Sequence, residues 1–254
     1  MLIDTHAHLY ASEFDDDRKE VLEKALEKGV KKILLPNIDS HSIEGMMQME
    51  VDFPNICYPM MGLHPCSVKE NYREELSLMR RWIDKRDFIA IGEIGIDLYW
   101  DKTFVKEQEE AFLEQTRWAL EKGWPIVIHS RESIDMILDL LEPLKSPALR
   151  GVFHCFSGNS EQAKRIMDLG FYMGLGGVLT FKNSGLDKVV RELPLSSLIL
   201  ETDAPYLAPT PFRGKRNESA YVALVAEKLA EVKEISIDEI ERITTENAKN
   251  LFIC

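Results

Sequence analysis

The sequence predicts an α/β fold, a (β/α)8 or TIM barrel with one helix appended at its C-terminal end. Two patterns predict this class: eight short apolar runs of strand length, and an amphipathic segment after each of them. A third observation is the absence, after the first run, of the Gly-x-Gly-x-x-Gly motif that an open nucleotide-binding sheet would favour. Because α/β barrels of about 250 residues form one domain, residues 1–254 are expected to be a single TIM-barrel domain.

The predicted strands are short runs of apolar and β-branched residues that end at polar or turn-forming residues. In chain order they are Leu2–His6, Lys32–Pro36, Tyr58–Leu63, Ile89–Gly92, Ile126–His129, Gly151–His154, Phe171–Gly174 and Leu198–Glu201. Helices between successive strands imply right-handed parallel crossovers, and eight is the strand number of a TIM barrel. A closed barrel therefore fits the pattern better than an open sheet.

The predicted helices are segments in which apolar residues mostly recur at intervals of three and four. They are Arg18–Glu27, Ser42–Val51, Glu74–Asp84, Lys106–Glu121, Ser133–Leu141, Glu161–Leu169, Leu186–Glu192 and Ala220–Val232. A last segment, Ile237–Asn250, follows Ser236, and Glu239 lies three residues beyond this serine, as in a capping box. It is expected to form the appended helix.

The composition is that of an ordinary soluble globular protein, with 45% hydrophobic and 29% charged residues. The opening Met-Leu-Ile-Asp reaches a charge too early for a secretory signal, and no run approaches the roughly 18 apolar residues of a membrane span. The four scattered cysteines are expected to be reduced thiols: Cys57, Cys66, Cys155 and Cys254. We therefore expect a cytoplasmic protein without membrane association.

The net charge of −12 has the wrong sign for a protein that binds nucleic acid by bulk attraction to phosphates. A nucleic-acid role would therefore require a local basic site or bound cations.

Chemistry-bearing side chains gather at the ends of the predicted strands, where active sites of parallel barrels lie. Five of the six histidines occupy such ends: His6, His8, His64, His129 and His154. His6 and His8 are two residues apart, so on a strand they share one face and can chelate a divalent ion. Five independent placements at one rim are hard to attribute to packing, and they predict a metal site.

Seven short motifs carry a resemblance that spans the chain. The chain resembles the TatD family of metal-dependent deoxyribonucleases, which are amidohydrolase-like barrels. The motifs are Asp4-Thr5-His6-Ala7-His8, Gly62-Leu63-His64-Pro65, Gly92-Glu93-Ile94-Gly95-Ile96-Asp97, His129-Ser130-Arg131, His154-Cys155-Phe156-Ser157-Gly158, Glu201-Thr202-Asp203-Ala204-Pro205 and Pro211-Phe212-Arg213-Gly214-Lys215-Arg216-Asn217.

The resemblance implies two divalent metal ions that share one carboxylate. The first ion would be held by His6, His8 and Asp203, the second by His129 and His154, and both by Glu93. Imidazole and carboxylate ligands suit Zn²⁺, Mn²⁺, Ni²⁺ or Fe²⁺, whereas the resemblance implies Mg²⁺-supported activity, so the metal identity stays open. Two such ions can activate a water and polarise a phosphoryl oxygen, which makes Glu93 and Asp203 the expected catalytic residues. Asp203 is a candidate general base, with a role as ligand alone as the alternative.

Two residues near the ligands are expected to contact substrate. His64 precedes Pro65 and is favoured as a phosphate contact over a role as metal ligand. Arg131 lies two residues beyond His129 and could grip a phosphate bidentately, with a salt bridge at a helix end as the alternative.

A local basic segment follows the last predicted strand. Arg213, Lys215 and Arg216 could hold a nucleic-acid backbone while the ring of Phe212 stacks on a base. A merely solvated loop is the alternative.

Three further carboxylates lie beside the expected ligands. Asp4 shares strand parity with His6 and could brace it, Glu201 could orient a ligand histidine, and Asp97 could cap a turn.

The predicted activity is divalent-metal-dependent hydrolysis of phosphodiester bonds. The resemblance implies a deoxyribonuclease with 3′–5′ exonuclease action, and single-stranded 3′ ends of DNA as the substrate. An amidohydrolase or lactonase, or an aminoacyl-tRNA deacylase, could use the same site, because one barrel hosts many chemistries. A non-catalytic metal-binding protein is a third class. The sequence predicts no oligomeric state.

Overall fold

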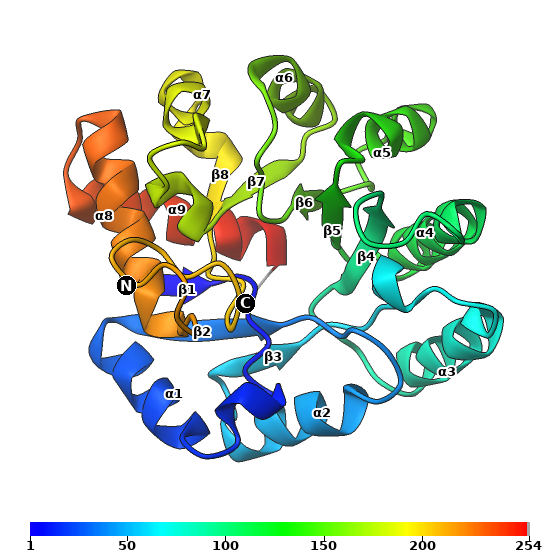
Figure 1. Cartoon of the computed structure of the whole chain (residues 1–254). Helices are drawn as coiled ribbons and strands as arrows, with labels where there is room; N and C mark the ends of the chain where they lie inside the picture. Colours follow the sequence, from blue (N-terminus) through cyan, green and yellow to red (C-terminus); the bar gives the residue numbers. More distant parts are fainter. Residues whose placement is uncertain (253–254) are drawn as a thin grey trace.

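The computed structural model describes residues 1–252, and it forms the predicted barrel of parallel strands surrounded by helices (Figure 1). The strands are β1 (Leu2–Asp4), β2 (Val30–Leu35), β3 (Cys57–Pro59), β4 (Ile91–Asp97), β5 (Ile126–Arg131), β6 (Gly151–Phe153), β7 (Tyr172–Leu175) and β8 (Leu198–Leu200). Each lies at its predicted place and differs from the prediction only at its ends. The predicted (β/α)8 fold is confirmed.

The barrel closes through two short links between arcs of paired strands. One arc has the order β1-β2-β3 and the other β4-β5-β6-β7-β8. A bridge between Met61 and Ile91 joins β3 to β4, and a bridge between Ala7 and Ala204 joins the ends of β1 and β8. The amide of Thr5 also donates to the carbonyl of Leu200 across the second link, at 3.1 Å. Every strand thus has a neighbour on both sides.

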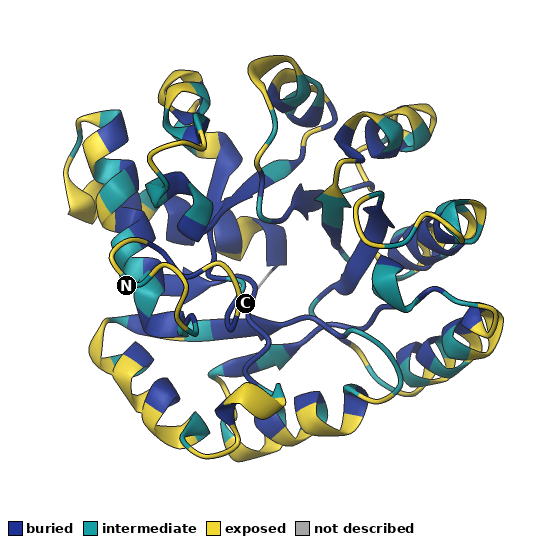
Figure 2. Cartoon of the chain, viewed as in Figure 1, coloured by how far each residue is buried: buried dark blue, intermediate teal, exposed yellow. Residues whose placement is uncertain are grey.

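The outer helices follow the strands in the predicted order. They are α1 (Arg18–Glu27), α2 (Ile43–Asp52), α3 (Tyr72–Lys85), α4 (Val105–Lys122), α5 (Ile134–Leu141), α6 (Ser160–Asp168), α7 (Leu186–Glu192) and α8 (Val222–Lys233). Figure 2 shows their inner faces buried and their outer faces exposed, as their apolar periodicity predicts. No helix within residues 1–252 is long and apolar enough to cross a membrane.

The appended helix, α9 (Ile237–Phe252), closes one end of the barrel. Its buried residues Ala248, Leu251 and Phe252 pack in one cluster with strand residues that include Ile3 of β1 and Val127 of β5. The amide of Glu239 donates to Oγ of Ser236 at 3.3 Å, so the predicted N-cap forms. Cys254 lies outside the described residues.

The opposite end of the barrel is formed by the other ends of the strands. Because all strands are parallel, their carboxyl ends meet at this rim, and the predicted site residues lie there.

Candidate metal centre

Glu93, on β4, lies at the centre of the predicted ligand set and faces two groups of imidazoles. Its Oε2 lies 3.1 Å from Nε2 of His6 and 3.6 Å from Nε2 of His8. Its Oε1 lies 2.8 Å from Nε2 of His154 and 2.9 Å from Nδ1 of His129. One carboxylate therefore spans both halves of the set, one oxygen for each half.

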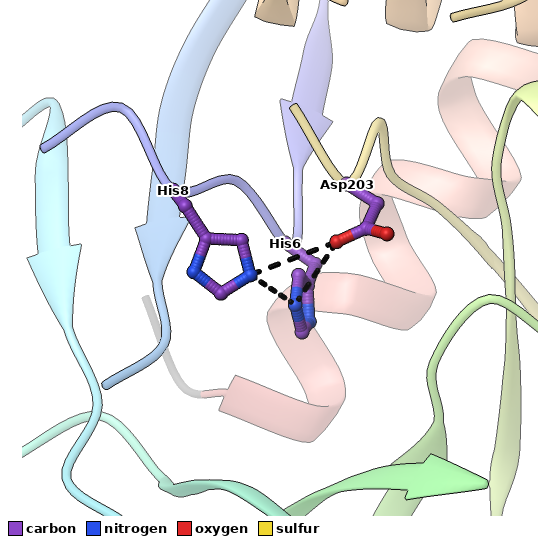
Figure 3. A group of neighbouring side chains, drawn as sticks. All are labelled: His6, His8 and Asp203. Carbon is purple, nitrogen blue, oxygen red and sulfur yellow. Dashed lines mark hydrogen bonds and ion pairs between the residues drawn. The ribbon is translucent and has the colours of Figure 1, made fainter. Parts of the chain in front are cut away.

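His6, His8 and Asp203 form one compact group (Figure 3). The Nε2 atoms of the two histidines are 3.3 Å apart, and Oδ1 of Asp203 lies 3.6 Å from each of them. The prediction that β1 continues to His6 is wrong, since the strand ends at Asp4. Beyond Asp4 the chain bonds to β2 and also to the segment after β8: the amide of Ala7 donates to the carbonyl of Leu34, the amide of Asp203 to that of His6, and the amide of His8 to that of Ala204. This extended pairing keeps both imidazoles on one side.

Asp4 ties the ends of β1 and β8 together, as expected of a brace for His6. Its carboxylate accepts hydrogen bonds from the amide of His6 at 3.3 Å and from the amide and hydroxyl of Thr202 at 2.9 and 2.6 Å. The neighbouring Asp203 adopts a left-handed backbone with φ of 61°, a conformation that costs a non-glycine residue about 1 kcal/mol or more. Hydrogen bonds across the closure of the barrel thus hold a strained ligand in place.

The second group differs in membership from the expected one. Around Glu93, donor atoms of His64 and His129 lie close enough for one ion, as do those of His6 and His154. Glu93, His129 and His154 do not together form such a group among the described residues. His64 lies in the cluster as well, with its Nε2 3.2 Å from Nδ1 of His129 and 3.4 Å from Oε1 of Glu93.

Hydrogen bonds on the far side of His8 fix which nitrogen carries its proton. The hydroxyl of Tyr10 donates its single proton to the carbonyl of Pro36 at 2.5 Å. It therefore accepts from Nδ1 of His8, which lies 2.8 Å away. In neutral His8 this leaves the lone pair on Nε2, the atom that faces His6 and Asp203. The tautomer suits a metal ligand.

The same reasoning separates His129 from His64. Nε2 of His129 lies 2.8 Å from Oδ2 of Asp97 and its Nδ1 2.9 Å from Oε1 of Glu93, so without metal both nitrogens can donate to a carboxylate. A bound metal would displace the proton of Nδ1, while Asp97 would keep the other proton on Nε2. Nδ1 of His64 instead accepts from the amide of Cys66 at 3.0 Å. Neutral His64 therefore carries its proton on Nε2 and presents an N–H to the cluster, where a ligand would need a lone pair.

Glu201 lies behind His154. Its Oε1 accepts a hydrogen bond from the amide of Cys155 and lies 3.4 Å from Nδ1 of His154, without making a hydrogen bond to it. A Cβ on Gly174 would lie 2.3 Å from Oε2 of Glu201, so only glycine leaves room for this carboxylate. Glu201 thus lies against His154, and its expected role in orienting a ligand histidine stays a prediction.

The donor set fits divalent metal ions. Nδ1 of His6 and of His154 are buried without a hydrogen-bond partner, and the two rings stack with centroids 3.9 Å apart. Burial alone would raise the pKa of Glu93, but electrostatic interaction with the surrounding imidazoles of His154, His64 and His6 outweighs burial and holds the pKa well below its usual value. The pocket therefore favours an ionised carboxylate among imidazoles, a combination that binds Zn²⁺ and similar ions.

Three side chains of the cluster are partly exposed to solvent. The side chains of Glu93, His6, His8 and His154 are at most 5% exposed. Those of Asp203, His64 and His129 are 13–16% exposed. A substrate can therefore reach the cluster from the side of these three residues.

Arg131 follows His129 at the end of β5 and is exposed. Its guanidinium lies over the rings of Tyr99 and Trp100, 3.9 and 5.3 Å from their centroids. Within residues 1–252 it forms no salt bridge, so the alternative of a helix-end ion pair finds no support.

The basic segment after β8 divides into paired and unpaired cations. Arg216 binds both carboxylate oxygens of Asp17, at 2.8 and 2.6 Å, so its charge is neutralised inside the protein. Arg213 lies over the ring of Phe181. Neither Arg213 nor Lys215 has a carboxylate partner among the described residues. The ring of Phe212 stacks on Tyr221 with centroids 4.4 Å apart, which occupies one of the faces expected to meet a base.

Three residues that support the site received no role in the sequence analysis. Tyr10 fixes the tautomer of His8, as described above. Buried Asn37 donates to the carbonyl of Gly62, and its own carbonyl accepts from the amide of Glu93. Asn217 donates to the carbonyls of Thr202 and Tyr206. Asn37 directly follows the second predicted strand, and this position was the one signal that could have pointed to it.

Known proteins are similar to this chain over nearly its whole length. The metal-dependent hydrolase YabD of Bacillus subtilis, described as uncharacterized, is 42% identical over 99% of each chain. The crystal structure of YjjV, a TatD homologue of Escherichia coli K12, superposes with a TM-score of 0.94 at 31% identity, covering 100% of this chain and 98% of that one. A protein of Pantoea ananatis named 3′-5′ ssDNA/RNA exonuclease TatD is 28% identical over 99% of each chain. The family model described as TatD-related DNase matches residues 3–253, so the chain belongs to the TatD family of metal-dependent hydrolases.

Proposed function

We propose that this metal-dependent hydrolase is a deoxyribonuclease that cleaves phosphodiester bonds at two divalent metal ions. One observation carries the proposal: the two oxygens of Glu93 face separate groups of imidazoles, one with His6 and His8, the other with His129 and His154. A carboxylate shared in this way is the arrangement that two ions need to act on one phosphate. Zn²⁺, Mg²⁺, Mn²⁺ and Ni²⁺ are the candidate ions.

Each side chain around the cluster has a defined task in this proposal. Bound ions would lower the pKa of a water and polarise a phosphoryl oxygen. Asp203, partly open to solvent, accepts the proton of the attacking water. His64 donates the hydrogen of its Nε2 to a phosphate oxygen, because its Nδ1 is already an acceptor for Cys66. Arg131 donates to a neighbouring phosphate with nitrogens that no carboxylate binds in residues 1–252.

The proposed substrate is single-stranded DNA, attacked from its 3′ end. The name of the Pantoea ananatis relative supports this direction and a single-stranded substrate. Arg213 and Lys215 supply the local positive charge that a chain of net charge −12 needs in order to bind a polyanion.

A labelled-substrate assay tests the proposal. Single-stranded DNA labelled at its 3′ or 5′ end is incubated with the protein, with and without each divalent ion and chelator. We expect mononucleotides from the 3′ end, and we expect chelator or Glu93→Ala to abolish their release. Glu231→Ala, which removes an exposed carboxylate on α8, is the matched control and should retain full activity. Release that survives both chelator and Glu93→Ala would contradict the proposal.

The basic segment discriminates this activity from hydrolysis of a neutral lactone or amide. Arg213→Ala combined with Lys215→Ala should weaken DNA cleavage and leave hydrolysis of an uncharged substrate unchanged. Arg216 is left intact in this variant because its ion pair with Asp17 supports the fold.

A further inference from the structure

Exposed large hydrophobic side chains concentrate at the rim that bears the metal centre. Four of those in residues 1–252 lie on two loops there: Tyr99 and Trp100 after β4, and Tyr206 and Leu207 after β8. The others are Met1, Val51 and Ile237, which lie away from these loops. Solvent-exposed aromatic rings next to a reaction centre indicate a binding surface.

The pair Tyr99 and Trp100 is fixed to the metal centre. Both of their amides donate to Oδ1 of Asp97 at 2.9 Å, while Oδ2 of the same carboxylate binds His129 at 2.8 Å. Arg131 lies over the Tyr99 ring. One carboxylate thus holds a proposed ligand and two exposed rings, and a cation that can bind phosphate lies against them.

Tyr206 occupies the other loop and is fixed in a similar way. Its amide donates to the carbonyl of Asp203 at 2.8 Å, and its carbonyl accepts from Asn217 at 2.6 Å. Its ring centroid lies 6.0 Å from that of His8.

The two aromatic groups stand on opposite sides of the barrel mouth. The strand order separates β4 from β8 by four steps in either direction around the ring. Figure 1 shows these two strands across the barrel from one another. Glu93 and its histidines lie between the two groups: His129 shares the carboxylate of Asp97 with the first group, and His8 lies beside the ring of Tyr206 in the second.

We propose that these rings form two nucleobase-binding subsites, Tyr99 and Trp100 on one side of the scissile phosphate and Tyr206 on the other. The inference rests on the proposed phosphodiesterase function and adds how the substrate is held. A single strand that crosses the mouth brings its phosphate to the metal centre and one unpaired base to each aromatic group. Stacking on a ring tolerates any base, so these subsites select single strands without reading sequence. Base-paired DNA keeps its bases inside the duplex and cannot make both contacts.

Binding is measured without turnover, on the metal-free protein in chelator, by anisotropy of a fluorescently labelled single-stranded oligonucleotide. Trp100→Ala and Tyr206→Leu should each weaken binding about tenfold, a typical loss for one base–aromatic stack. Trp100→Phe, which keeps a ring, should restore most of the affinity. Val51→Ala is the matched control, since Val51 is 68% exposed like Trp100 but lies on α2. Equal affinity of wild type for the normal oligonucleotide and for one with abasic residues throughout would overturn the proposal.

Cleavage provides the second readout. The substrates are a normal oligonucleotide and one whose last two 3′ residues are abasic. Trp100→Ala and Tyr206→Leu should lose about tenfold in kcat/KM on the normal substrate and nothing on the abasic one. An equal loss on both substrates, or no loss on either, would refute the base contacts. If wild type cleaves neither, the phosphodiesterase function fails, and the binding measurement still decides whether the rings hold bases.

Discussion

The hydroxyl of Tyr10 connects a proposed metal ligand to the backbone after β2, so removing this oxygen tests how a fixed tautomer supports metal binding. In Tyr10→Phe, Nδ1 of His8 loses its 2.8 Å acceptor and the carbonyl of Pro36 loses its 2.5 Å donor. Loss of such an orienting partner lowers metal affinity by about 10- to 100-fold. Loss of the hydrogen bonds should also lower the free energy of unfolding by about 1 kcal/mol. We expect the affinity for the ion beside His8 to fall and the affinity for the ion beside His129 to stay unchanged.

Competition with a chromophoric chelator resolves the two affinities, with Zn²⁺ as the titrant. Tyr58→Phe is the matched control, because the Tyr58 hydroxyl also joins two groups, Lys32 and the carbonyl of Asn55, but lies away from the cluster. A folded Tyr10→Phe protein that binds both ions within twofold of wild type would show that Tyr10 does not orient His8 for metal binding.

Three further predictions concern the same cluster. His64→Gln should lower kcat/KM for DNA roughly 10- to 100-fold, because it removes a hydrogen bond to a charged phosphate. The variant should still bind two ions per chain, and loss of one ion would identify His64 as a metal ligand. In the metal-free protein burial lowers the pKa of His154, but the charges of Glu93 and Glu201 outweigh it and raise the pKa well above 6.5. Protonated His154 therefore contributes stability below pH 6.5 that is lost as pH rises through its raised pKa, and metal must displace this proton, so metal affinity should increase with pH. Calorimetry in two buffers of different ionisation enthalpy should detect proton release on metal binding, and equal heats in both would count against it. Arg216→Ala should lower the free energy of unfolding, measured in urea, by on the order of 1 kcal/mol. It should leave the salt dependence of DNA binding unchanged. If the slope of the logarithm of the binding constant against the logarithm of the salt concentration falls in magnitude by about one, Arg216 contacts phosphate instead.

Strand and helix placement was predictable because each element follows a local pattern. A run such as Leu198–Leu200 must be buried on both faces of a parallel barrel, so it reads as continuously apolar. The rim position of the histidines follows from the same rule, since a parallel barrel collects all carboxyl ends at one edge. The early end of β1 was not predictable, because it depends on bonds between His6 and Asp203, which are nearly 200 residues apart in the chain.

Partners that come from distant segments explain the remaining differences. The basic segment at 213–216 shows three cations in the sequence, but only the fold brings Asp17 to Arg216. His64 resembles any other rim histidine until its Nδ1 meets the amide of Cys66. Tyr10 stands two residues beyond His8, yet its role depends on the carbonyl of Pro36. Residue type and spacing therefore predict which groups gather, whereas hydrogen bonds made in the fold decide which nitrogen is free to bind metal.

Anomalous diffraction from crystals grown with Mn²⁺ would locate the ions of the proposed centre. We expect two peaks per chain, each contacting one oxygen of Glu93, with His6, His8 and Asp203 around the first and His129 and His154 around the second. His64 should remain outside both coordination spheres. A single peak, or a second ion held by His64 in place of His154, would rule out the proposed two-metal centre.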